Sequence, residues 1–179
     1  MESALPPLES RALSSGIARR TLKNLDFIKK NACRADVHPV TQVVNSLLSL
    51  LVFPVAKDKA LFASFEKKLR FEDPSDPSGV CAALIQELSV PSLQVAKVGR
   101  CKGLGSFFRR LRNAVSHKNL EFSGTDPDSR TLAAVMVTLR DCPYPKGKPG
   151  PVDWEITLTA EDLEKLSRYV ADDVIRQGL

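Results

Sequence analysis

The 179-residue chain has few of the residues that most often carry chemistry: two histidines, four cysteines and one tryptophan. It also lacks a long apolar run, because its longest apolar stretch, from Leu50 to Ala56, is interrupted by Pro54. A membrane-spanning helix needs ~20 apolar residues, so no span is predicted. Residues 1–11 carry acids and prolines where a signal peptide has basic residues before an apolar run. We therefore expect a soluble protein of the cytoplasm.

The cysteines follow neither a metal-binding nor a disulfide pattern. Cys33, Cys81, Cys101 and Cys142 are scattered, with no CxxC pair and no histidine at zinc-finger spacing. Scattered thiols in an intracellular protein are normally reduced. We predict no structural zinc, no disulfide framework and no cofactor.

The overall composition is that of a globular protein, with 43% apolar and 26% charged residues. This is too apolar for a disordered chain and too polar for a membrane protein. The length suits one domain with a sizeable core. We expect a single domain over residues 1–179.

The net charge of +5 is unevenly distributed. Every charged residue from Lys97 to Lys118 is a base, whereas acids outnumber bases from Asp153 to the C-terminus. A basic segment on a chain with an acidic tail indicates a localised site for a polyanion. The alternative, a solvated charged face, stays open on charge alone.

Apolar residues at helical spacing predict helices along most of the chain before residue 117. The predicted helices are Ser10–Arg34, Val40–Leu51 with Pro39 in its first turn, Lys57–Arg70, Gly79–Leu88 and Leu104–Ser116. Between them, Glu72–Gly79 is predicted to be a turn-rich linker and Pro91–Lys102 to be irregular.

The pattern then changes to the two-residue period of strands. Leu120–Phe122, Leu132–Leu139 and Val152–Leu158 predict a small antiparallel sheet inserted at about residues 120–158. Thr159 is the expected cap of a last helix that carries Leu163 and the apolar residues after it. The predicted fold class is mainly α: a helical bundle with this sheet before the C-terminal helix.

The helix Leu104–Ser116 has the clearest amphipathic pattern. Its apolar stripe consists of Leu104, Phe107, Phe108, Leu111 and Val115. We expect the two phenylalanines to pack in the core instead of stacking on bases.

A polar patch lies beside this stripe at the end of the same helix. It consists of Arg112, Asn113, Ser116 and His117, with Asn113 and His117 four residues apart and so on one side of the helix. The patch offers an acid/base group, an anion binder and two hydrogen-bonding side chains. The alternative is that His117 only caps the helix end while Arg112 is solvated.

These residues resemble a known family. Arg112-Asn113-x-x-x-His117 on the penultimate helix resembles the R-x(4–6)-H signature of the HEPN superfamily. The string His38 to Asn45, the motif helix and the strand–helix junction from Trp154 to Leu163 resemble a plasmid-borne branch with a small β insert before the last helix. The resemblance extends from Ile17 to Val174.

The resemblance implies a metal-independent endoribonuclease that works as a homodimer, often as a toxin or in defence against phage. Some members of the superfamily have lost catalysis and bind RNA or a protein partner such as an antitoxin. A non-catalytic HEPN-like module is therefore the second hypothesis, and a helical adaptor with no nucleic-acid role is the third.

The chemistry of RNA cleavage fits the residues of the patch. Attack by the ribose 2′-hydroxyl needs a base, an acid for the leaving oxygen and a cation for the phosphorane charge. We expect His117 to act as general acid/base and Arg112 to bind the scissile phosphate. Asn113 would orient His117 or the phosphate, and Ser116 would assist. The predicted RNA-binding residues around them are Arg109, Arg110 and Lys118.

A single credible histidine leaves the reaction one proton-transfer group short. A two-fold dimer that brings two Arg112–His117 pairs together would supply the second, with the motif helix at the interface. The other histidine, His38, precedes Pro39 and is expected to be a local cap or loop residue.

Overall fold

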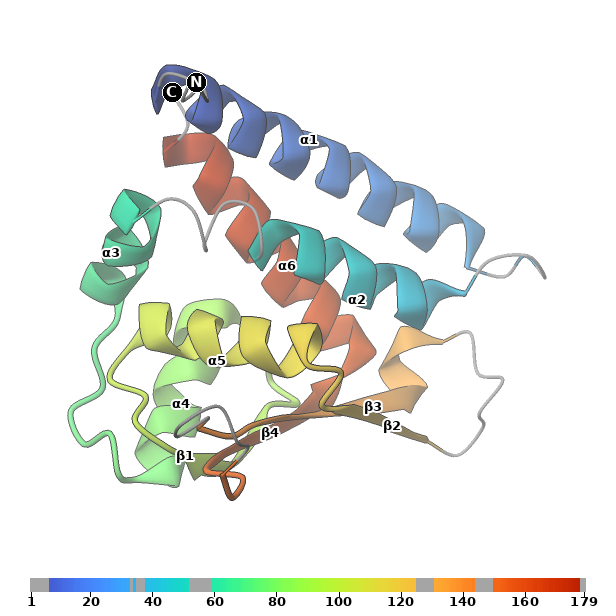
Figure 1. Cartoon of the computed structure of the whole chain (residues 1–179). Coiled ribbons are helices and arrows are strands. Elements are labelled where there is room, and N and C mark those ends of the chain that lie inside the picture. The colour runs from blue at the N-terminus through green and yellow to red at the C-terminus, as the bar shows by residue number, and fades with distance from the viewer. Residues whose placement is uncertain are drawn as a thin grey trace.

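The computed structural model describes residues 7–32, 34, 38–51, 59–124, 131–143 and 150–177, and the statements below concern these residues. Helices dominate them (Figure 1). The helices are α1 (Pro7–Asn31), α2 (Pro39–Leu50), α3 (Lys59–Lys68), α4 (Pro77–Leu88), α5 (Leu104–Ser116) and α6 (Ala160–Gln177). None of them combines the length and the apolar character that crossing a bilayer requires.

Four antiparallel strands form one sheet beside the helices. They are β1 (Gln94–Val98), β2 (Leu120–Gly124), β3 (Val135–Asp141) and β4 (Trp154–Thr159), in the order β1-β4-β3-β2. A short 3₁₀ turn, η2 (Leu132–Ala134), precedes β3, so this strand begins three residues later than predicted. The predicted fold class, mainly α with a small antiparallel sheet before the last helix, is confirmed.

The sheet contains one strand that the sequence analysis missed. β1 lies in the segment Pro91–Lys102, which was predicted to be irregular, and it precedes α5 instead of following it. It is an edge strand, and its pairing with β4 is shifted by an irregularity between Val95 and Lys97. The shift breaks the apolar alternation by which a strand is recognised.

The elements stack in layers (Figure 1). Helices α1, α2 and α6 contact one another, and α5 lies between them and the sheet, in contact with α2 and β3. Helix α4 packs against β1 and α3 packs against α5. Helix α5 is therefore covered by helices on one side and by the sheet on the other.

The core forms where α5 meets the sheet. In β3 and β4 buried residues alternate with partly exposed ones, and the fully buried Trp154 of β4 contacts Phe107 edge-on, with ring centroids 5.8 Å apart. Phe108 contacts Phe107 and, from α3, Phe65 in similar geometry. Such aromatic pairs add about 1 kcal/mol each beyond the burial of their area. Phe107 and Phe108 are core residues, as predicted.

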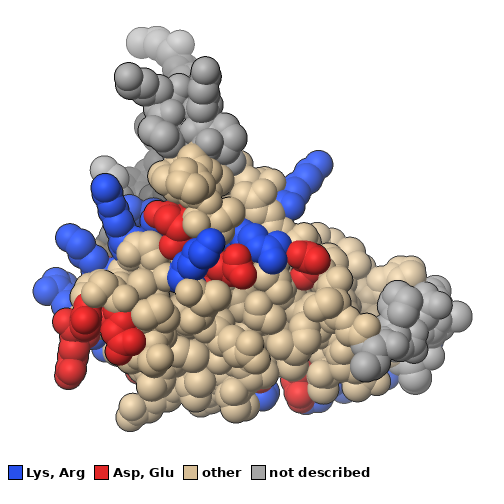
Figure 2. Space-filling view, turned by 90° about the horizontal axis from the view of Figure 1, so that it is seen from below, with Lys and Arg blue, Asp and Glu red and all other residues tan. Residues whose placement is uncertain are grey.

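The opposite face of the sheet is exposed to solvent. Seen from below, uncharged residues cover most of it (Figure 2). On this face Arg140 forms ion pairs with Glu121 and Glu155, at 2.9 and 3.0 Å. The hydroxyls of Thr138 and Thr157 lie 2.9 Å apart across β3 and β4. This polar pattern explains why the sheet needs no helix on its second side.

Two helix starts show how local sequence sets the boundaries. The side chain of Asp76 accepts hydrogen bonds from the backbone of Ser78 and Gly79, so α4 begins at Pro77, two residues before its predicted start. The predicted cap of α6 is confirmed, because the Thr159 hydroxyl accepts a bond of 3.2 Å from the Asp162 amide.

Candidate functional site

The N-terminus of the motif helix α5 is anchored by α3 and by the residues that directly follow α3. The Glu66 carboxylate of α3 accepts a hydrogen bond of 2.9 Å from the backbone amide of Ser106, in the first turn of α5. The amide of Leu104 donates to the carbonyl of Leu69 at 3.0 Å. Gly103 allows this approach, because a Cβ there would lie 2.4 Å from the Leu69 oxygen. The start of the helix is thereby held in place.

The C-terminus of α5 ends in a Schellman motif that places His117 at the helix cap. The amide of Lys118 donates to the carbonyl of Val115, and the amide of Asn119 donates to that of Ala114. Lys118 adopts the left-handed conformation that this motif requires, with φ of +58°, although it is not glycine. The turn leaves both His117 and Lys118 exposed.

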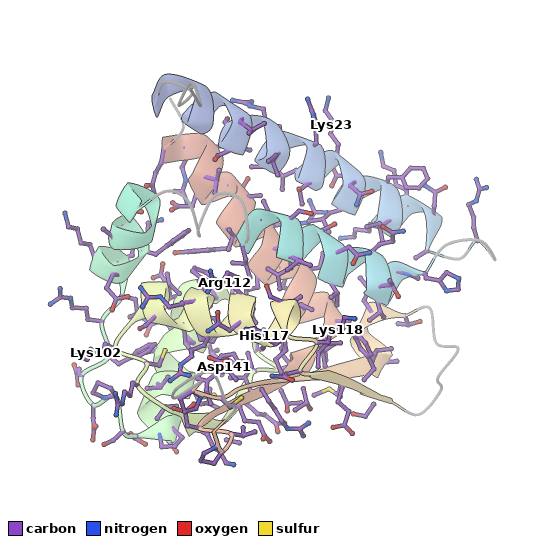
Figure 3. All side chains as sticks on the ribbon, in the orientation of Figure 1. Lys23, Lys102, Arg112, His117, Lys118 and Asp141 are labelled. Atoms are coloured by element: carbon purple, nitrogen blue, oxygen red, sulfur yellow. The ribbon has the colours of Figure 1, made fainter. Side chains whose placement is uncertain are left out.

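The predicted patch lies in the last turns of α5 and at its C-terminal cap, where Figure 3 marks Arg112 and His117. Arg112 and Asn113 are partly buried and their side chains hydrogen-bond to each other, while Ser116 and His117 are exposed. The amide of His117 donates to the carbonyl of Asn113 at 2.9 Å, one helical turn away. The guanidinium of Arg112 and the imidazole of His117 thus belong to residues five positions apart, about 1.4 turns, at the end of one helix.

A buried aspartate of the sheet, Asp141, connects this patch to β3. The Asn113 Oδ1 atom accepts hydrogen bonds from Arg112 Nε at 3.2 Å and from Arg112 Nη2 at 2.5 Å. The Asn113 Nδ2 group donates to Asp141 Oδ2, at the end of β3, at 3.3 Å. The side chains therefore form a chain of contacts from the sheet through Asn113 to Arg112.

Arg110 belongs to this polar chain and not to the RNA-binding surface on which it was predicted. Its Nη1 donates to Asp141 Oδ2 at 2.9 Å, and Nη1 and Nη2 each donate to one oxygen of Asp153 at 3.1 Å. Burial lowers the pKa of Arg110, but hydrogen bonds and charges from both aspartates outweigh it and raise that pKa above its ordinary value. The contacts make Arg110 a structural residue, because two carboxylates neutralise its charge and its side chain is only 15% exposed.

Neither Asp141 nor Asp153 was predicted from the sequence. One signal for Asp141 was available: it follows Val135, Val137 and Leu139 at the two-residue period of the strand, so it extends the core-facing row. An acid at a core-facing position needs a partner. Asp153 lies in a loop and offers no such signal.

Two further residues named from the sequence, Arg109 and His38, lie outside this patch. Arg109 is exposed on α5 one position before the structural Arg110. His38 occupies the cap position of α2, as expected, but its side chain makes no capping hydrogen bond.

Three of the four cysteines lie in the described part of the chain. Cys81, Cys101 and Cys142 are free thiols there, and Cys33 lies outside the described residues. Burial raises the pKa of Cys101 to about 11, so its thiol is protonated and unreactive at neutral pH. Within the described residues no cluster of three or more histidine, cysteine or acidic side chains is suited to a metal ion.

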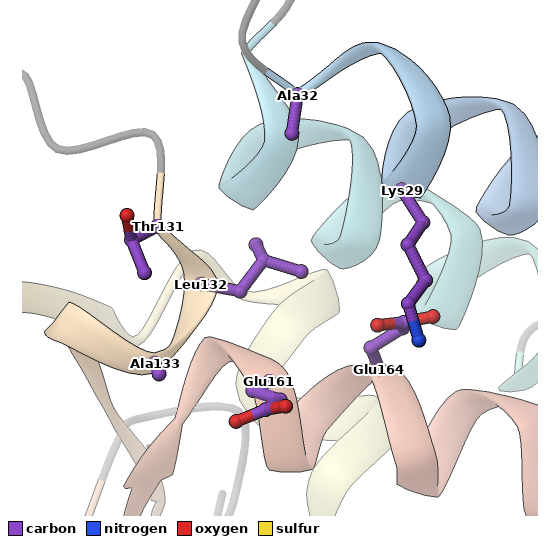
Figure 4. A pocket seen from close by; sticks show the side chains of 7 residues that line it. All are labelled: Lys29, Ala32, Thr131, Leu132, Ala133, Glu161 and Glu164. Atoms are coloured by element: carbon purple, nitrogen blue, oxygen red, sulfur yellow. The ribbon is translucent and has the colours of Figure 1, made fainter.

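A second candidate site is a pocket of about 380 Å³ that no residue of the motif lines (Figure 4). It is formed by the end of α1, by η2 and by the first turns of α6. Lys29, Ala32, Thr131, Leu132, Ala133, Glu161 and Glu164 line it. Two carboxylates against one lysine make this pocket unsuited to a polyanion.

Comparison with known proteins matches the chain to one family. The family model described as HEPN pEK499 p136 matches residues 5–178. No match was found among curated proteins or among solved structures. Since the matched range covers nearly the whole chain, including the motif helix and the sheet, the protein belongs to the HEPN pEK499 p136 family.

Proposed function

We propose that this protein is a metal-independent endoribonuclease that cleaves RNA through attack of a ribose 2′-hydroxyl on its own phosphate. Membership of a HEPN family supports this proposal. The single observation that carries it is the arrangement at the end of α5, where Asn113 hydrogen-bonds to the guanidinium of Arg112 and the exposed His117 follows Asn113 by one helical turn.

Each group of the patch has a chemical role in this reaction. Arg112 binds the scissile phosphate and stabilises the charge that develops on the phosphorane, for which a planar guanidinium is well suited. His117 transfers protons, since imidazole titrates close to neutral pH. Asn113 orients Arg112, and Ser116 assists from the exposed last turn of the helix.

The RNA on either side of the cleaved bond would lie along exposed basic side chains on and beside α5. Arg109 and Lys118 are exposed, and Lys102 is exposed just before the start of the helix. Figure 3 places Lys102 and Lys118 towards opposite ends of α5, with Arg112 between them. These cations would bind phosphates without reading the sequence of the RNA.

The reaction needs two proton-transfer groups, and the patch supplies one per chain. We therefore propose a homodimer in which the ends of two α5 helices face each other across a shared cleft. Such an enzyme would act as a toxin or in defence against phage, held in check by an antitoxin protein.

The test is RNA cleavage in the presence of EDTA. Wild-type protein should release products with 2′,3′-cyclic phosphate ends, and a substrate with a 2′-deoxyribose at the cleaved position should resist. His117→Ala should abolish cleavage, whereas His38→Ala, which removes the only other histidine, should retain it. Cleavage by His117→Ala would refute the assignment, and RNA binding without cleavage would favour the non-catalytic module.

The dimer is tested by mixing subunits. A tenfold excess of His117→Ala chains should place most wild-type chains in mixed dimers and suppress their activity. If activity followed only the amount of wild-type protein, each chain would act alone and the shared cleft would be wrong.

A further inference from the structure

We infer that Asp141 is a positioning residue for the proposed cleavage: it fixes the side-chain amide of Asn113 so that Asn113 presents its oxygen to Arg112. The inference rests on the proposed function, because it assigns a role in that reaction to a residue of the sheet. Asp141 touches neither the phosphate nor the imidazole and acts through Asn113.

The position of Asp141 is set by the sheet. It is the last residue of β3, pairs with Trp154 of β4 and has a side chain only 1% exposed. A carboxylate so deeply buried needs hydrogen-bond donors. It finds two, both from α5: Arg110 at 2.9 Å and Asn113 at 3.3 Å. The acid therefore connects the sheet to the motif helix.

The chemistry of a carboxylate determines which way the Asn113 amide points. An ionised carboxylate can only accept hydrogen bonds, so the NH₂ group of Asn113 must face Asp141. The amide oxygen then faces Arg112, whose guanidinium has only donors. A neutral partner that both donates and accepts would allow the opposite orientation, in which the NH₂ group of Asn113 would face the guanidinium.

The hydrogen bonds to Asn113 occupy one edge of the Arg112 guanidinium and leave the other edge available to bind a phosphate. Two of its five N–H groups, one on Nε and one on Nη2, bond to Asn113 Oδ1. The remaining three make no hydrogen bond to a described residue. A guanidinium held on one edge is pre-ordered to bind phosphate with the other.

The way in which the two aspartates bind Arg110 supports a role for Asp141 beyond the ion pair. Asp153 uses both of its oxygens on Arg110. The Oδ2 atom of Asp141 accepts hydrogen bonds from both Arg110 and Asn113. Its buried Oδ1 atom has no hydrogen-bond partner among the described residues. This is a poor geometry for an ion pair alone, and it is explained if the position of Asp141 also serves Asn113.

The test compares Asp141→Asn with Asp153→Asn. Each change removes one negative charge from beside Arg110, but only the first touches Asn113. Asp141→Asn should lower kcat/KM for RNA about tenfold, the loss expected when one side chain is no longer pre-ordered. Asp153→Asn should keep the wild-type rate. An equal loss of rate in both variants would overturn the inference.

Asn113→Ala shows whether Asp141 acts through Asn113. This variant leaves the buried ion pair in place and should reproduce the loss of rate caused by Asp141→Asn. The double variant Asp141→Asn/Asn113→Ala should be no slower than Asn113→Ala, because both changes break the same chain of contacts. Multiplicative losses would mean that Asp141 acts independently, which would overturn the inference.

A readout without RNA separates this inference from the proposed function. In ¹⁵N NMR spectra the bonded Nε–H of Arg112, assigned by its loss in Arg112→Lys, should be protected from exchange. It should lose protection in Asp141→Asn and keep it in Asp153→Asn. If this holds while no RNA is cleaved, the positioning stands and the nuclease proposal fails. If RNA is cleaved but the signal is unchanged in Asp141→Asn, the inference fails alone.

Discussion

Replacing Arg110 by methionine should destabilise the fold, although Arg110 lies in the most basic part of the chain. Methionine keeps an unbranched apolar stem of similar length and removes the charge. The change leaves Asp141, which is 1% exposed, without its cation, and it removes the cation of Asp153, which is 30% exposed. The perturbation therefore acts on a buried charge and not on the surface.

The magnitude follows from this burial. Removing one partner of a buried ion pair typically costs about 3–5 kcal/mol, because an uncompensated charge stays inside. Arg110 is itself 15% exposed, so some water reaches the pair and we expect about 3 kcal/mol. If the free energy of unfolding falls by about 2 kcal/mol per M of urea, the unfolding midpoint should fall by about 1.5 M.

The assay is equilibrium unfolding in urea, with Arg109→Met as the matched control. Arg109 is the preceding residue of the same helix but is exposed, so the same substitution should leave the midpoint nearly unchanged. In RNA binding, Arg109→Met should reduce the slope of log affinity against log salt by about 0.7, as expected for one lost phosphate contact on a single strand.

The double variant Arg110→Met/Asp141→Leu checks the cause. If the cost comes from an unpaired buried charge, removing that charge should restore much of the lost stability. A midpoint shift below about 0.5 M for Arg110→Met, or a double variant less stable than the single one, would refute the reasoning.

Two further predictions concern the ends of the helices. Lys118→Gly should raise the unfolding midpoint slightly, because glycine adopts the φ of +58° without strain, and should weaken RNA binding through the lost cation; a lower midpoint would mean that Lys118 carries no strain. Asp162 accepts hydrogen bonds from the Ser92 amide and hydroxyl at 2.7 and 2.6 Å, and Asp162→Asn should cost about 2 kcal/mol at pH 7. Burial raises the pKa of Asp162, but hydrogen bonds from Lys165 and Ser92 outweigh it and lower that pKa from 3.8. The stability that the ionised Asp162 contributes is therefore complete above pH 3.8 and is lost as the pH falls through the lowered pKa, so wild type and Asp162→Asn should converge in acid-unfolding curves. A difference that persisted after NMR showed Asp162 to be protonated in the folded protein would contradict this linkage.

The motif helix could be predicted from the sequence because its information is local. The apolar stripe of α5 repeats at helical spacing, and Arg112, Asn113 and His117 are neighbours on that helix whatever it packs against. The same holds for Thr159, whose capping role involves residues three positions apart.

The ion pairs of Arg110, and with them its structural role, could not be predicted in this way. Its partners Asp141 and Asp153 lie 31 and 43 residues away and are brought to α5 only by the folded sheet. From the sequence alone Arg109 and Arg110 are equivalent bases, and only the rotation of the helix against the sheet distinguishes them. β1 was missed for a related reason, since an edge strand with an irregularity has no clear alternation.

The register of β3 connects the core of the protein to the candidate site. Side chains alternate along a strand, so a slip of one residue would turn Asp141 outward and place a neighbour opposite Asn113. The pairing of Asp141 with Trp154, and of Leu139 with Ile156, resists such a slip, because Trp154 and both apolar partners are buried. Trp154 in turn packs on Phe107, six residues before Asn113 on α5. The contacts that stabilise the core therefore also set the distance between the carboxylate and the amide, and a change at Trp154 should disturb Arg112 without touching it.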